Sequence, residues 1–187
     1  MMAAEASMTF RIRKLHWMMG AWFVAAAIAR ADESPEKLAP LLVRAMDLDS
    51  QALASMQRRA AAELESGSIT REHSVCLLAV ERAALAGALE ENAQRELTAR
   101  EMREAIDYFE SPAGQKDVRI RRGLMNVDQA STQEYLAMRA FALTGAGLKL
   151  LTYNVLTSTA TSSRRVNARE REIWWGCLAK WPVRAGR

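Results

Sequence analysis

Apolar residues recur every three or four positions along most of the chain, which is the spacing of one face of an α-helix. A first helix is predicted to start at Ser34-Pro35, because a capping residue precedes a proline suited to the first helical turn. Three successive apolar faces are expected: Leu38, Leu41, Leu42 and Ala45; Leu53, Met56, Ala60 and Leu64; and Val75, Leu78, Leu85 and Leu89 in one longer helix capped by Thr70. The pattern predicts an all-α fold with a single compact multi-helix domain.

Two helices with well-marked ends are predicted in the middle of the chain. Thr98 and Glu101 have the spacing of a capping box, and the helix that they open has Met102, Ala105, Ile106 and Phe109 on one face. Ser111-Pro112 ends this helix and starts the next, because proline suits a first turn but cannot continue a helix. Another helix is expected over residues 128–143.

The helical pattern weakens after residue 143. Residues 150–161 are rich in Thr, Val and Tyr, and they fit a helix, a short strand or an extended arm. We interpret residues 157–163 as a polar linker and predict a last helix from about Ala168, stopped by Pro182. No tandem repeat is evident. The expected organisation is a signal segment (1–31), a helical domain (32–156), and a polar linker with a basic, Trp-rich C-terminal helix (157–187).

The first 31 residues have the three parts of a cleavable secretory signal peptide. Basic residues at positions 11, 13 and 14 precede an apolar stretch of 14 residues, from Leu15 to Ile28. Ala29-Arg30-Ala31 then provides the small side chains that signal peptidases need, so we expect cleavage after Ala31 and a periplasmic or secreted protein. The alternative is a retained anchor, although a membrane-spanning helix needs about 20 apolar residues.

Removing the signal segment changes the charge of the protein. The whole chain has 26 basic and 22 acidic residues, a net charge of +4. Four of the basic residues and one acidic residue lie within the first 31 positions, so the mature chain has a net charge of only +1. This balance is not that of a nucleic-acid-binding protein, and we expect no nucleic-acid partner.

Both cysteines, Cys76 and Cys177, lie in the mature part of the chain. In an oxidising compartment an even pair of cysteines is a candidate disulfide. Two separately buried thiols are the alternative, because a free cysteine behaves as a small apolar residue.

The segment Tyr108-Phe109-Glu110-Ser111-Pro112-Ala113-Gly114-Gln115-Lys116 resembles the hallmark of a bacterial family known as domain of unknown function 2059. Members combine a signal peptide with a small helical domain that has an aromatic pair followed by x-Ser-Pro-x-Gly-x-Lys, and the resemblance covers roughly residues 97–125. The aromatic pair is Tyr-Phe here, where Phe-Tyr is usual. Because the family has no established activity, the resemblance implies a helical fold and an envelope location.

A structural role is expected for the motif. Phe109 would anchor the end of one helix, Ser111 would cap the next, and Gly114 would allow a tight corner between them. Lys116 could form an ion pair with Glu110 or Asp107.

No catalytic or metal-binding pattern stands out. The only histidine of the mature chain, His73, is expected at a helix surface or cap, and neither zinc-ligand spacing nor a nucleophile elbow occurs. Acidic residues occur in pairs or at helical spacing (Glu90, Glu91, Glu101, Glu104 and Asp107), but arginines are interleaved with them, as on a solvated helix face. Thr144 to Lys149 has a glycine-rich sequence that fits a helix-ending turn better than a phosphate loop. We expect no catalytic residue, cofactor or metal.

The C-terminal segment is the strongest candidate for a functional surface. From Arg164 onward it has seven basic residues against two acidic ones, and its tryptophans accompany the arginines: Arg169, Arg171, Trp174, Trp175 and Trp181. Such a segment can lie on a membrane surface or bind an acidic partner, or it can dock its tryptophans on the core.

The sequence therefore favours an exported, non-catalytic binding or interaction module whose partner is an envelope protein or the membrane surface. The alternatives are an envelope hydrolase that uses carboxylates, and a structural protein that forms homo-oligomers through the small-residue helix face at residues 83–88.

Overall fold

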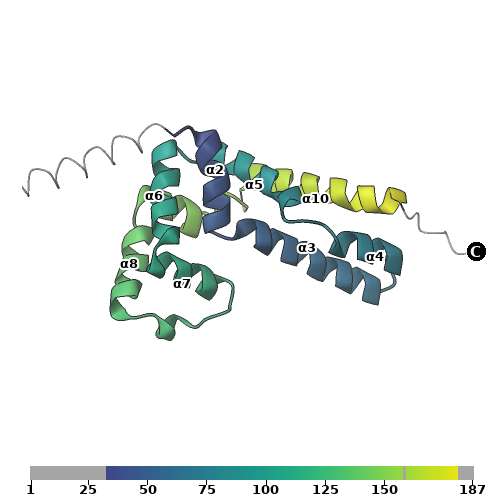
Figure 1. Ribbon diagram of the computed structural model, residues 1–187, viewed down its shortest axis with the longest axis horizontal. Coiled ribbons are helices and arrows are strands. Elements are labelled where there is room, and N and C mark those ends of the chain that lie inside the picture. The colour runs from purple at the N-terminus through teal and green to yellow at the C-terminus, as the bar shows by residue number, and fades with distance from the viewer. Residues whose placement is uncertain (1–32, 158, 181–187) are drawn as a thin grey trace, which may run out of the picture. The chain divides into compact units, whose positions relative to one another are not determined.

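The computed structural model describes residues 33–157 and 159–180. The predicted signal segment and Trp181 lie outside these residues. The helices are α2 (Pro35–Ala45), α3 (Leu48–Glu65), α4 (Arg71–Leu78), α5 (Ala83–Glu96), α6 (Ala99–Glu110), α7 (Pro112–Arg121), α8 (Thr132–Ala142), α9 (Gly145–Gly147) and α10 (Ala160–Lys180), with a 3₁₀ turn η1 (Val127–Gln129) and a π-helical turn η2 (Leu148–Thr152) (Figure 1). The described part of the chain contains no strand, which confirms the predicted all-α fold.

None of the helices in the described ranges has the length and apolar character needed to cross a membrane.

The main core lies where α2 packs against α5 and α6 (Figure 1). Leu38 and Leu42 of α2 are buried in one cluster with Met102 and Phe109 of α6, and Leu156 closes the cluster from the segment after η2. The predicted apolar faces of the first helix and of α6 therefore meet each other.

A second, smaller core joins α3, α4 and α10. It contains Ala60, Ile69, Leu77 and Cys177, all of them buried. Cys76 and Cys177 form a disulfide, with Cα atoms 5.8 Å apart, that ties α4 to α10 across 101 positions of sequence. The disulfide is thus part of the packing that fixes the C-terminal helix on the body of the protein.

The single long helix predicted between Thr70 and Leu89 is wrong. The chain breaks after Leu78 and restarts at Ala83: α4 packs on α3 and α10, and α5 packs on these two helices and also on α2. Tertiary packing therefore overrides the local pattern. Thr70 does cap α4, because its hydroxyl accepts a hydrogen bond from the backbone N–H of His73.

The polar linker predicted at residues 157–163 is also wrong in part, because α10 begins at Ala160. Buried Asn92 of α5 explains this start: its side-chain amide donates to the carbonyls of Leu156 and Ser162 at 2.9 and 3.2 Å, and its oxygen accepts from Arg165 at 2.9 Å. These bonds hold the beginning of α10 on α5, so the structure has no domain boundary at residue 157, and the described residues from Pro35 to Lys180 form one compact unit.

Residues 98–116 and 131–149 share one layout, shifted by 33 positions from Glu101 to Glu134. Each begins with a capping box, continues as a helix, and turns into a second helical segment through a Ser or Thr cap. The matched pairs are Thr98 and Ser131, Glu101 and Glu134, Tyr108 and Phe141, Ser111 and Thr144, Ala113 and Ala146, Gly114 and Gly147, and Lys116 and Lys149. The prediction that the chain has no tandem repeat is therefore wrong. The repeat lies mainly in its caps and turns, and only weakly in its apolar positions.

The two halves of this repeat hold each other reciprocally. Lys116 of the first half pairs with Glu134 of the second at 2.7 Å, and Lys149 of the second half pairs with Glu101 of the first at 2.8 Å. Such an exchange of equivalent contacts is what a two-fold relation between two units produces.

Candidate functional site

The family-like motif forms the corner between α6 and α7. The Ser111 hydroxyl donates to the Tyr108 carbonyl at 2.6 Å and accepts from the backbone N–H of Gly114 at 3.1 Å. A Cβ atom on Gly114 would lie only 2.0 Å from the Tyr108 carbonyl oxygen, so only glycine fits here. Phe109 is fully buried. These contacts agree with the predicted structural role of the motif.

Tyr108 links the motif to both halves of the repeat. Its ring stacks on that of Phe141, its counterpart, with centroids 3.9 Å apart and planes 11° apart. Its hydroxyl donates to the Asp117 carboxylate at 3.0 Å, and Arg121 pairs with the other oxygen at 2.9 Å. Burial and the neighbouring Asp117 raise the pKa of Tyr108, so the hydroxyl stays protonated as a hydrogen-bond donor.

The predicted partners of Lys116, Glu110 and Asp107, are wrong. Lys116 instead reaches Glu134 at the start of α8. Hydrogen bonding from Lys116, with further bonds from Ser131, lowers the pKa of Glu134 from 4.5 to about 2. Sequence spacing could not find this pair, because its members are 18 residues apart on different helices.

The second lysine of the repeat acts in the same way. Burial alone would raise the pKa of Glu101, but hydrogen bonds from Lys149 and Thr98 outweigh that effect and lower it. Lys149 also donates to the carbonyl of Glu96 at 3.1 Å. Both capping-box glutamates are therefore engaged in structural contacts.

The acidic residues proposed for hydrolysis do not converge. Of the five acids at positions 90, 91, 101, 104 and 107, only Glu91 lines one of three hollows on the described residues, and it lies there with Glu172 beside Arg165 and Arg169. No group of three or more His, Cys, Asp or Glu side chains with metal-binding geometry occurs within residues 33–157 and 159–180.

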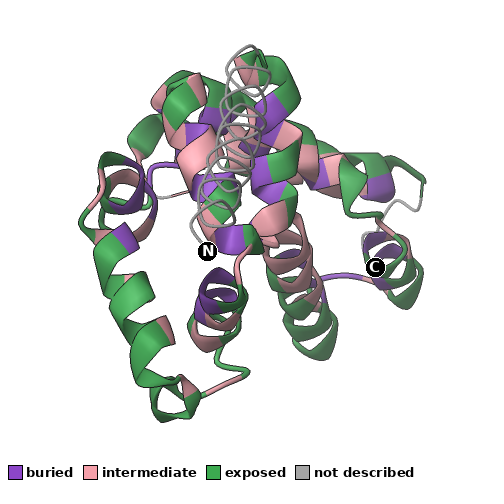
Figure 2. Ribbon diagram, turned by 60° about the vertical axis from the view of Figure 1, so that its left-hand side comes forward, coloured by how far each residue is buried: buried purple, intermediate pink, exposed green. Residues whose placement is uncertain are grey.

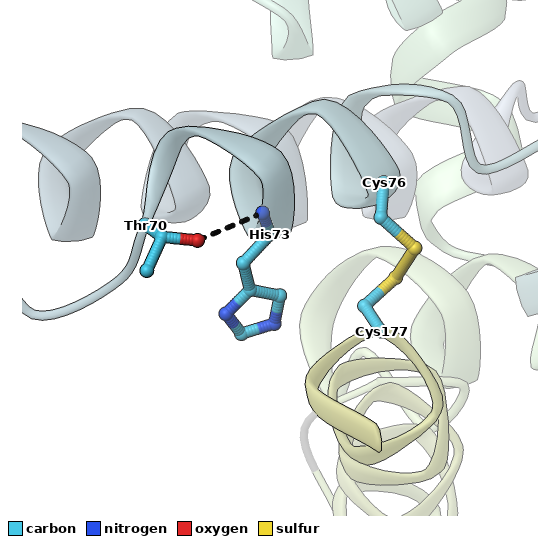
Figure 3. Close-up of a disulfide and its surroundings, with 4 residues drawn as sticks. All are labelled: Thr70, His73, Cys76 and Cys177. Carbon is cyan, nitrogen blue, oxygen red and sulfur yellow. Dashed lines mark hydrogen bonds between the residues drawn. A yellow bond between two sulfur atoms is a disulfide. The ribbon is translucent and has the colours of Figure 1, made fainter. Parts of the chain in front are cut away.

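His73 is the clearest departure from the sequence-based expectation. Its side chain is fully buried rather than exposed, and neither ring nitrogen has a hydrogen-bond partner among the described residues. The ring lies on the same side of α4 as the disulfide of Cys76, towards α10 (Figure 3), and its edge meets the ring of Trp174 at a centroid distance of 5.5 Å. His73 therefore fills the second core as an apolar ring would.

Two basic residues of α10 have a structural role. Arg165 donates to Asn92, and Arg169 donates to the carbonyl of Ala84 at 2.8 Å and pairs with Glu172, so both dock α10 on α5. The small-residue face of α5 meets α10 at the same place, which gives it a role within the chain.

Arg171 and the two described tryptophans of the tail lie on the side of α10 that faces α3. Arg171, Trp174 and Trp175 line a hollow of about 470 Å³, together with Arg59 of α3 and Glu170. The Arg59 guanidinium lies over the Trp174 ring at 5.1 Å, and Trp175 is 66% exposed. We call this surface the α3–α10 groove.

Both basic and apolar side chains line the groove: Arg59 and Arg171, with Trp174, Trp175 and Leu178. Arg171 is exposed and forms no ion pair within the described part of the chain. Burial raises the pKa of Glu170, and Arg59 opposes the rise. The structure thus brings together Arg171, Trp174 and Trp175, turns Arg169 away to α5, and adds Arg59, which lies more than 100 positions earlier in the chain.

Residues 87–140 match the model of a family described as an uncharacterised protein conserved in bacteria (DUF2059). Comparison with curated proteins and with solved structures gave no match. The matched segment contains most of α5, the whole Ser-Pro-x-Gly-x-Lys corner and nearly all of α8. This match supports the resemblance to the DUF2059 family that the Ser-Pro-x-Gly-x-Lys motif indicates, for the segment of residues 87–140.

Proposed function

We propose that this protein is an exported, non-catalytic binding module whose α3–α10 groove takes an acidic peptide segment with apolar side chains from an envelope protein. The observation that carries the proposal is the position of Arg171, without an ion partner in the described residues, beside the exposed ring of Trp175 and in the same hollow as Arg59.

Two features support export. The first 31 residues have the layout of a cleavable signal, and the disulfide between Cys76 and Cys177 suits an oxidising compartment. Mass spectrometry of the protein recovered from a periplasmic fraction should give the mass of a chain that begins at Asp32. Recovery of the full-length chain from the cytoplasm would contradict this part of the proposal.

The chemistry of the groove supports an acidic, partly apolar ligand. Indole rings contribute a large apolar area to binding surfaces, and arginines form bidentate bonds with carboxylates. A hollow lined by the exposed ring of Trp175, by Arg171 and by Arg59, which also pairs with Glu63 at 3.6 Å, suits a chain that carries both carboxylates and aliphatic side chains. A membrane surface is the less suitable occupant, because Trp174 and Glu170 lie inside a concave surface.

Binding can be tested with a fluorescent peptide in which glutamates alternate with leucines, and with a lysine–leucine peptide as the charge control. The wild-type protein should bind the glutamate peptide more tightly. Arg171→Glu should weaken that binding by tenfold or more, equivalent to about 1.4 kcal/mol, and Trp175→Ala should weaken it as well.

Arg164→Glu is the matched control, because Arg164 lies on the same helix outside the groove and bonds to the carbonyl of Ala160. Equal losses from Arg164→Glu and Arg171→Glu would show a non-specific charge effect and contradict the proposal. Preferential binding to anionic phosphatidylglycerol vesicles, with no preference between the two peptides, would favour a membrane surface instead. Truncation before α10 is unsuitable, since it would remove Cys177 and Arg165.

A further inference from the structure

The solvent side of α8 has several exposed apolar side chains, three of them at positions where α6 has charged residues. Phe141 is the only buried residue of α8, and Figure 2 colours most of this helix as exposed. The exposed side chains at Tyr135, Leu136 and Leu143 are 45%, 57% and 77% accessible. At 3.6 residues per turn these residues and Ala140 span about 140° of the helix, with Arg139 among them. We call this surface the α8 face.

The internal repeat provides a reference for the α8 face. The half-buried side chains of Glu134, Met138 and Ala142 lie on the opposite side of the helix, towards the first half of the repeat. In α6, the positions equivalent to Leu136, Ala140 and Leu143 carry the charged residues Arg103, Asp107 and Glu110. The same scaffold therefore has charges at these positions of one helix and apolar groups at those of the other. Several exposed apolar side chains gathered on one side of a helix mark a candidate interaction surface.

The first half of the repeat shows that an amphipathic helix, α2, covers α6, the counterpart of α8. Met102 and Ile106 of α6 are buried in the main core together with Leu38 and Leu42 of α2, an amphipathic helix that packs on α6. The equivalent positions in α8 are Tyr135 and Arg139, and both are exposed. Within the described residues α8 packs mainly on α7, α9 and η2, so it has no counterpart of α2.

The positive charge of Arg139 favours an acidic partner over a second copy of this chain as the ligand of the α8 face. Arg139 is the only charged residue among the exposed positions of this face, and it has no hydrogen bond or ion pair within the described ranges. In a two-fold pairing of two α8 faces with the axis midway between Leu136 and Leu143, Arg139 would lie beside its own copy. A partner with an acidic side chain at this point would avoid that repulsion.

We propose that the α8 face binds an amphipathic helix of a partner protein, which lies on α8 much as α2 lies on α6 and places an acidic residue against Arg139. This is the helix-in-groove mode of recognition, in which a few apolar side chains at helical spacing anchor the ligand. The proposal does not depend on the α3–α10 groove.

The test uses the mature protein and a fluorescent helical peptide with leucines at i, i+3, i+4 and i+7 and one glutamate beside the stripe. A second peptide carries lysine in place of that glutamate. Wild-type protein should prefer the glutamate peptide, and Arg139→Glu should reverse the preference, with a change of tenfold or more in the ratio of the two affinities. Leu136→Ser and Leu143→Ser, both at exposed positions, should weaken the binding of both peptides.

Arg119→Glu is the matched control, since Arg119 is an exposed arginine on the neighbouring α7. It should leave the peptide preference unchanged. Arg171→Glu, which alters the α3–α10 groove, should also leave it unchanged, so the failure of either proposal can be recognised separately.

Three results would overturn the proposal. The first is an Arg139→Glu variant with the wild-type peptide preference. The second is a concentration-dependent dimer in sedimentation that Leu143→Ser abolishes, which would assign the α8 face to a second copy of the chain. The third is binding to neutral phosphatidylcholine vesicles that depends on Leu136 and Leu143, which would assign it to a lipid surface.

Discussion

Gly147→Ala tests the internal repeat at its tightest contact. A Cβ atom at this position would lie 1.9 Å from the carbonyl oxygen of Phe141 and 2.7 Å from its carbonyl carbon. The obstructing atoms belong to the backbone of α8, so no side chain can rotate out of the way. The segment formed by α9 and η2 must instead move by about 1 Å, and this disturbs the packing of buried Ala146 and Leu150.

The expected loss of stability is about 2 kcal/mol. Overpacking of a well-packed core costs about 1–3 kcal/mol, and the rigid backbone contact favours the upper end of that range. The higher helix propensity of alanine than of glycine offsets about 1 kcal/mol of this loss of stability. For a domain of this size, about 3 °C of melting temperature corresponds to each kcal/mol, so the midpoint should fall by about 6 °C.

Urea and thermal unfolding followed by circular dichroism would measure this loss. Gly114→Ala should cost a similar amount, because its Cβ atom would lie 2.0 Å from the carbonyl oxygen of Tyr108 at the equivalent corner. Gly87→Ala is the control: nothing lies within 4 Å of its Cβ position in α5, so this change should be neutral or stabilising by up to about 1 kcal/mol. If Gly147→Ala proved as stable as Gly87→Ala, the close helix contact described above would be refuted.

Four further predictions concern stability. Reduction of the Cys76–Cys177 disulfide should lower the free energy of unfolding by up to about 4–5 kcal/mol in the chain-entropy model, since it closes a loop of 101 positions; urea midpoints unaffected by reductant would argue against the bond. Because the pKa of Glu134 falls from 4.5 to about 2 on folding, its ionised form stabilises the fold above about pH 4.5, and this contribution is lost as the pH falls towards 2. The pH–stability profile of Glu134→Gln should therefore be flatter than that of wild type over this window, and parallel profiles would count against the ion pair. Phe109→Ala should cost about 3–5 kcal/mol, because the ring is fully buried; an unchanged melting temperature would show that the ring is not part of the core. His73→Phe should be tolerated or stabilising by about 1–3 kcal/mol, since it removes two buried nitrogens without partners, and a marked loss in calorimetry would reveal a hydrogen bond that the structure does not show.

The local features of the fold could be predicted from the sequence. The caps at Thr98 and Ser111 and the helix start at Pro35 are present as predicted, because each depends on residues within one helical turn. The burial of Phe109 follows from the apolar spacing of α6. The family motif was recognisable for the same reason, since it is a short, continuous corner between two helices.

The candidate sites were only partly predictable. Trp174 and Trp175 stood out through the composition of the tail, whereas Arg59 gave no signal, because its contact with Trp174 crosses from α3 to α10. The basic tail also suggested a larger binding surface than the structure provides, since Arg165 and Arg169 are engaged in docking α10.

What the sequence by itself determined, then, is the fold class, the caps and the corner motif, all of which depend on neighbours along the chain. The tertiary structure alone decided the partner of Lys116, the burial of His73 and the start of α10 beside Asn92. Each of these depends on a contact between helices, and the free energy of burial and hydrogen bonding there exceeds the local preference of the residues involved. The two halves of the repeat share their caps, their turns and the reciprocal lysine–glutamate pairs, while most of their apolar positions differ, so the repeat is clearer in the tertiary structure than in the apolar pattern of the sequence.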